Sequence, residues 1–208
     1  MKKSIFVLVS AGAIIFACYN SNAYPFTEES EIIKPGSEIS MDVNAGSRKS
    51  HEDVNVVAAE FVSIDPGVSA FMKSLVQNYL AVKNALVNNE ESKAAKASAR
   101  IIELVKNFDK SLLTSDQKKV YDGIVDELKE QAEQISRNKI EEQRDHFSKL
   151  SKNVYGLVKA FGADIALHYD QCPMYNNGST WLSETKEIRN PYYGSQMMTC
   201  GSVVEVVQ

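Results

Sequence analysis

The stretch Asp65-Pro66-Gly-Val-Ser-Ala-Phe-Met-Lys-Ser-Leu-Val-Gln-Asn-Tyr79 opens the first regular element of the chain and sets its fold. Asp followed by Pro is typical of a helix N-terminus, because the carboxylate accepts hydrogen bonds from free backbone N–H groups and Pro has no N–H to leave unpaired. Apolar residues then recur every three or four positions, which predicts one buried helix face. They are Val68, Phe71, Met72, Leu75, Tyr79, Val82 and Leu86.

Three further stretches carry the same periodicity. Thr114 and Gln117 have the spacing of a capping box, and Asn138 precedes Glu141 at the same spacing, so helices are expected to begin after both Thr114 and Asn138. The four predicted helices cover roughly residues 66–87, 90–110, 115–135 and 139–165. Because each apolar stripe needs a neighbour to cover it, the sequence predicts an all-α protein, an antiparallel up-down four-helix bundle.

The N-terminal part of the chain predicts export. Two lysines precede an apolar run that is too short for a membrane span of about 20 residues, which indicates a signal peptide over residues 1–23. Ile15-Phe16-Ala17-Cys18 predicts lipoprotein-type cleavage before Cys18, with lipidation of that cysteine; cleavage after Ala23 is the alternative. Residues 24–53 are polar and contain Pro and Gly, as in a flexible stalk. The folded domain is expected over residues 54–208, in the periplasm or at the cell surface, with a lipid anchor as its membrane attachment.

The net charge and the absence of known catalytic motifs argue against two classes of function, nucleic-acid binding and catalysis. The net charge of −4 argues against nucleic acid, whose binding usually needs clustered Lys and Arg. The sequence has no H-E-x-x-H, no G-x-S-x-G and no phosphate-binding glycine loop. We therefore expect a binding protein and no enzyme.

The C-terminal segment loses the helical period after Pro173. Turn formers follow at residues 176–178 and 190–194, so we expect an irregular loop lobe packed on the bundle. Residues 203–207 are typical of a short closing strand, and residues 54–64 are compatible with a strand or an extended lead-in.

Two sulfur motifs flank this lobe. The first is Cys172-Pro-Met174, and the second is Met197-Met198-Thr-Cys200. Thiolates together with thioethers are the ligands that a soft ion such as Cu(I) or Ag(I) prefers. If the fourth helix continues through His168 to Cys172, these two residues share one face, and His168 can join the site. Zinc is a less suitable ion for these motifs, because structural zinc takes four nitrogen or sulfur ligands and the motifs offer two cysteines and one nearby histidine.

A disulfide is the competing interpretation of the cysteines. In an oxidising compartment Cys172 and Cys200 are also a natural pair, and closing their loop of about 28 residues stabilises a fold by roughly 3–4 kcal/mol. The methionines would then be packing residues. Metal binding by the reduced pair and a disulfide in the oxidised pair are also compatible as two redox states.

Several longer motifs resemble one bacterial family, the domain of unknown function numbered 3347. They comprise residues 167–174 (LHYDQCPM), 181–183 (WLS), 187–194 (EIRNPYYG) and 197–201 (MMTCG), together with Tyr79-Leu80-x-x-Lys83-x-Ala85-Leu86. The likeness extends roughly over residues 58–204. The family occurs as single exported proteins and fused to periplasmic adaptor subunits of copper and silver efflux pumps, so the resemblance implies heavy-metal handling.

The resemblance and the local chemistry together define the expected site. The resemblance implies, position by position, that Cys172, Met174, Met198 and Cys200 are metal ligands. The spacing in this sequence adds His168 and Met197 as further candidate ligands. Trp181, Tyr192 and Tyr193 are expected to shield the site from water. The expected function is Cu(I) or Ag(I) binding for sequestration or delivery to an efflux adaptor. The alternative is a disulfide-stapled interaction module that presents Trp181 and the tyrosines to a partner protein.

Overall fold

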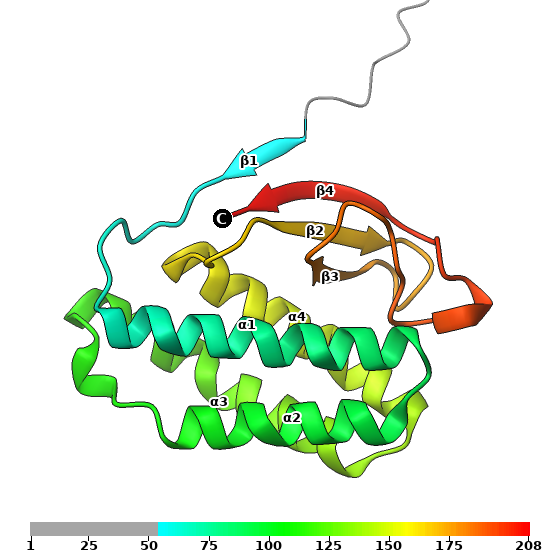
Figure 1. Ribbon diagram of the computed structural model, residues 1–208, viewed down its shortest axis with the longest axis horizontal. Helices are drawn as coiled ribbons and strands as arrows, with labels where there is room; N and C mark the ends of the chain where they lie inside the picture. The colour runs from blue at the N-terminus through cyan, green and yellow to red at the C-terminus, as the bar shows by residue number, and fades with distance from the viewer. Residues whose placement is uncertain (1–53) are drawn as a thin grey trace, which may run out of the picture. The chain divides into compact units, whose positions relative to one another are not determined.

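The computed structural model describes residues 54–208. The predicted signal peptide (1–23), the lipidation site Cys18 and the stalk (24–53) lie outside the described residues. Four long helices follow one another along the chain: α1 (Pro66–Val87), α2 (Glu91–Lys106), α3 (Ser115–Arg137) and α4 (Ile140–Phe161). Each packs against the next, and α4 returns to α1, so the four helices close an up-down bundle (Figure 1). In the described part of the chain no helix is both long and apolar enough to cross a membrane.

The helix starts follow the capping chemistry at two of the three predicted positions. The Asp65 carboxylate accepts a hydrogen bond of 2.7 Å from the Gly67 N–H. Thr114 and Gln117 form both bonds of the capping box that opens α3. The prediction for Asn138 is wrong, because this residue ends α3, and α4 begins after Lys139 without a side-chain cap.

The all-α prediction is wrong, because the C-terminal segment forms a sheet. Strands β2 (Leu167–Cys172), β3 (Ser179–Ser183) and β4 (Ser202–Val207) pair antiparallel, and β1 (Asn55–Val57) joins β4 in parallel. The strand order is β1-β4-β2-β3, a four-stranded mixed sheet. The closing strand expected at residues 203–207 is present as β4, but it belongs to this sheet rather than to an irregular lobe.

Gly162 explains why the fourth helix does not run on toward Cys172. It has φ +80°, a left-handed conformation that glycine adopts without steric cost, and it ends α4 directly after Phe161. The chain turns over residues 162–166 and continues as β2. His168 therefore lies on a strand, and the predicted extension of the helical stripe to His168 is wrong.

The sheet covers one side of the helical bundle, next to α1 and α4 (Figure 1). Tyr79 on α1 links the layers: its hydroxyl accepts a 2.9 Å hydrogen bond from the Leu182 N–H of β3 and contacts Ser151 of α4 at 2.9 Å. Tyr155 of α4 stacks on Tyr169 of β2 with ring centroids 3.8 Å apart. Helices and sheet thus share one core, and the loop 184–201 returns over the end of the sheet to start β4.

Candidate functional site

Two free thiols meet where β2 ends and β4 begins. Cys172 Sγ and Cys200 Sγ lie 3.1 Å apart, although 28 positions separate the residues in the sequence. Cys172 is the last residue of β2 and is buried, while Cys200 stands two residues before β4 and is partly exposed. The fold therefore joins the two sulfur motifs at their cysteines.

Asn190 holds the segment that carries Cys200. Its amide Nδ2 donates to the Cys200 carbonyl at 2.7 Å, and its backbone N–H donates to the Met198 carbonyl at 2.8 Å. The Asn190 Oδ1 also accepts from the Tyr192 N–H at 2.7 Å. The side chain is fully buried, so these bonds are shielded from competing water. Sequence reasoning identified Asn190-Pro191 as a turn but missed this positioning role.

Gly201 lets the Cys200 segment approach β2 closely. At φ +147° a Cβ atom on this residue would lie 2.8 Å from Trp181 Cη2 and 2.9 Å from the Gln171 carbonyl oxygen. Both distances are shorter than real contacts of a Cβ atom, and the rigid indole and the strand backbone have no room to give way. Glycine is therefore required next to Cys200.

The two thiols differ in acidity. Burial raises the pKa of the Cys172 thiol, but hydrogen bonds from the Cys200 thiol, from the Met174 and Tyr175 N–H groups and from the Asn190 amide outweigh burial and lower it. The hydrogen bond that Cys200 gives to Cys172 raises the pKa of Cys200. Cys172 is therefore the first of the two to become a thiolate, the form that binds metals.

His168 does not reach the thiols. It lies four residues before Cys172 on a strand, a separation of about 13 Å at the usual strand rise. Burial, and to a lesser extent Lys186, lowers the pKa of its imidazole. The prediction that His168 shares a helix face with Cys172 is wrong, because both residues lie on one strand. Four residues along a strand span about twice the length of four residues along a helix.

The three methionines sit in the turns next to the thiols. Met174 lies in the turn after β2 and is 63% exposed; Met197 follows the short helix η2 (Gly194–Gln196) and is 36% exposed. Met198 is partly buried. Each is within three residues of a cysteine, and a methionine side chain has three rotatable bonds with which to bring its thioether sulfur to a ligand.

The three aromatic residues expected to shield the thiols comprise two buried rings and one partly exposed ring. Trp181 and Tyr192 are buried and meet edge to face, with centroids 5.8 Å apart. Tyr175, a residue that the sequence did not single out, stacks on Tyr192 at 4.6 Å and meets Tyr193 edge to face. The Tyr193 hydroxyl donates to the Met174 carbonyl at 3.2 Å, which ties the two turns of the site together.

A buried carboxyl group lies on the strand face that Cys172 shares. Asp170 is fully buried and directly opposite Trp181 in the β2–β3 pair. Within residues 54–208 neither Asp170 carboxyl oxygen has a hydrogen-bond partner, nor does the Trp181 indole N–H. Burial raises the pKa of Asp170 to about 7, and the Lys83 ammonium opposes this rise only in part. Lys83 is instead ion-paired with Glu184 at 2.6 Å.

No further thiolate, imidazole or carboxylate ligand joins the thiol pair in the described part of the chain. Among residues 54–208 no three His, Cys, Asp or Glu side chains lie close enough together to hold one metal ion. Asp170 and His168 therefore do not complete a site with the cysteines. The methionine thioethers are the soft donors of this chain that lie within three residues of either cysteine.

Comparison with known proteins gives one match. Residues 75–165 match the model of a family described as a protein of unknown function (DUF3347). No curated protein and no solved structure matches the chain. The matched segment runs from Leu75 in α1 to just beyond α4, so it ends before β2 and both sulfur motifs. Over its helical segment the chain is thus similar to a family whose description assigns no activity.

Proposed function

We propose that this protein binds Cu(I) or Ag(I) through the Cys172–Cys200 pair, to sequester the ion or to deliver it to an efflux system. The observation that carries the proposal is the 3.1 Å approach of two free thiols, one of which is biased toward the thiolate. Two thiolates are a sufficient core for a soft ion, and nearby thioethers add neutral sulfur ligands that need no deprotonation.

Metal binding requires a small movement of one cysteine. Two thiolates on one ion are separated by up to about 4.6 Å if the metal–sulfur bond is about 2.3 Å, as for zinc thiolates. The pair must therefore open by roughly 1–1.5 Å. Cys172 is fixed in β2, whereas Cys200 lies in a turn closed by a hydrogen bond from its own N–H to the Met197 carbonyl. We assign the movement to Cys200, with Met198 and Met174 completing the shell and Met197 as the alternative ligand.

The cellular setting belongs to the same proposal. The signal-like N-terminus and Cys18 support an exported, lipid-anchored protein of the periplasm or cell surface. The resemblance to proteins fused to adaptor subunits of copper and silver efflux pumps supports such an adaptor as the partner. We propose a binding role and no catalytic one.

The proposal is tested by anaerobic Cu(I) titration of the reduced protein against a competing chelator. Cys172→Ser is expected to weaken binding at least about 100-fold, because it removes one of two anionic ligands, and Met198→Leu about 10-fold. Met72→Leu, a change of a buried methionine in the helical core, is the matched control and leaves the affinity unchanged. Unchanged stoichiometry and affinity in Cys172→Ser would refute the site.

A disulfide-stapled interaction module is the second candidate. The same 3.1 Å approach favours oxidation of the pair, and a bridge over 28 residues stabilises the fold by roughly 3–4 kcal/mol. The exposed Met174 and the partly exposed Tyr193 would then face a protein partner. Thiol counting on protein purified from its own compartment distinguishes the two functions: the module requires no free thiol, and the metal site requires two.

A further inference from the structure

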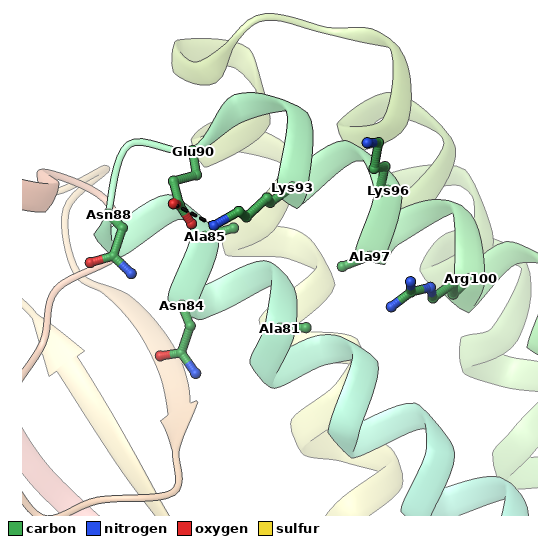
Figure 2. A pocket seen from close by; sticks show the side chains of 9 residues that line it. All are labelled: Ala81, Asn84, Ala85, Asn88, Glu90, Lys93, Lys96, Ala97 and Arg100. Atoms are coloured by element: carbon green, nitrogen blue, oxygen red, sulfur yellow. Dashed lines mark hydrogen bonds and ion pairs between the residues drawn. The ribbon is translucent and has the colours of Figure 1, made fainter.

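A hollow between α1 and α2 lies outside the thiol site. Its volume is about 380 Å³, and alanines from both helices, Ala81, Ala85 and Ala97, lie along its seam (Figure 2). Asn84 and Asn88 border it from the α1 side, and Lys93, Lys96 and Arg100 from the α2 side. Small apolar side chains between polar rims leave room for another chain to come close to the helix backbones.

The hollow is one end of a longer groove. A second hollow of about 550 Å³ shares Arg100 with the first, and a third of about 360 Å³ shares Ser74, Leu104 and Asn107 with the second. Together they follow the α1–α2 seam from the region of Gly67 to that of Asn88, about 30 Å at the helical rise. A helix of about 20 residues has this length, which makes the groove suited to an elongated ligand.

The rim of the first hollow carries positive charge that the domain does not neutralise. Lys93 pairs with Glu90 at 2.6 Å, and Lys106, at the end of α2, pairs with Glu103 at 3.0 Å. Lys96 and Arg100 stand one turn apart, and within residues 54–208 neither has a carboxylate at ion-pair distance. In a chain of net charge −4 these two unpaired cations are complementary to an acidic ligand from outside.

We propose that the α1–α2 groove binds an acidic amphipathic helix of a partner protein. The small and apolar face of that helix packs on the alanine seam, and carboxylates at one of its ends pair with Lys96 and Arg100. Helix-in-groove binding of this kind takes its affinity from the apolar face and its register from the charges. The exposed Ala81 beside the two cations favours an amphipathic peptide, which contacts both kinds of side chain, over an anionic membrane surface, which would pair with the cations alone.

The test uses calorimetric titration of the reduced full chain with a synthetic helical peptide of about 20 residues. The peptide has an Ala/Leu stripe and three Glu at one end, and a matched peptide has Gln in place of the three Glu. The wild-type protein is expected to bind the Glu peptide at least about 10-fold more tightly. The double variant Lys96→Glu/Arg100→Glu removes this preference, whereas Lys149→Glu/Lys152→Glu, the same charge change on exposed positions of α4, retains it.

A steric variant makes the test independent of charge. Ala81 is exposed in the seam, so Ala81→Trp fills the hollow without touching the core and is expected to weaken both peptides alike. Absence of binding to the wild type, equal affinity for the two peptides, or equal loss in the α4 control would overturn the proposal. Binding to phosphatidylglycerol vesicles that depends on Lys96 and Arg100, without peptide binding, would assign the groove to membranes instead. Cys172→Ser leaves peptide binding unchanged, so this result is separate from the metal proposal.

Discussion

At the scale of single residues, the thiol pair depends on neighbours that carry no sulfur. Asn190 donates hydrogen bonds to two carbonyls within the Cys200 turn, and Gly201 lets that turn approach Trp181 and β2. The cysteines were predictable because their motifs echo each other in the sequence. Asn190 and Gly201 were not, because their roles depend on contacts with β2 and β3 that exist only in the folded chain.

Asp170 predicts a pH dependence of stability. Its pKa is about 7 in the folded protein and 3.8 as the ordinary value, so between about pH 4 and pH 7 the unfolded chain releases a proton that the folded chain keeps. The free energy of unfolding contributed by this group therefore falls as pH rises through that window, by up to about 4 kcal/mol. Urea unfolding of the metal-free protein in chelator, across this pH range, measures the effect.

Asp170→Asn is expected to flatten this profile, because the amide does not titrate. Asp126→Asn, at an exposed position of α3, is the matched control and keeps the wild-type slope. If the profiles of Asp170→Asn and the wild type run parallel between about pH 4 and pH 7, the buried carboxyl is not the group responsible.

At the scale of elements, the fate of residues 162–172 separates the expected fold from the observed one. Local signals predicted the helices well: Asp65-Pro66 and the Thr114–Gln117 box open α1 and α3 as expected. The sheet escaped prediction because its pairings are long-range, as in the parallel register of Asn55 with Glu205. The buried Asp170 also breaks the alternation of apolar and polar residues by which β2 would otherwise be recognised.

The strand assignment gives a prediction for His168. Because about 13 Å of strand separates it from Cys172, His168→Gln is expected to leave the Cu(I) affinity within about two-fold of the wild type. The same competitive titration measures this, with Cys172→Ser as the variant that does lose affinity. A 10-fold or greater loss in His168→Gln would mean that the histidine is a ligand and that the end of β2 rearranges on metal binding.

At the scale of the whole molecule, the helical bundle and the sheet share one hydrophobic core. Tyr79, Phe147 and Tyr192 connect α1, α4 and the loop 184–201 through one stacked pair and one tilted pair of rings. The family match stops at residue 165, before the sheet that covers these rings. The helices alone would expose this apolar surface to water.

Truncation after residue 166 is therefore expected to abolish cooperative unfolding. The fragment retains helical far-UV circular dichroism but loses the sharp thermal transition of the full chain, as when specific packing is lost while helices persist. Hydrogen exchange of the α1 and α4 amides in the two proteins gives a second measurement. A sharp transition at the midpoint of the full chain would show that the bundle folds without its sheet.

Trp181 makes the intrinsic fluorescence of the protein a probe of the thiol pair. It is the single tryptophan of the chain, and its ring lies against Gly201, the residue after Cys200. Thiolates and copper ions both quench indole emission at short range. Metal binding to the thiol pair and oxidation of the pair are therefore both expected to change the tryptophan emission intensity, which is measured without any attached dye.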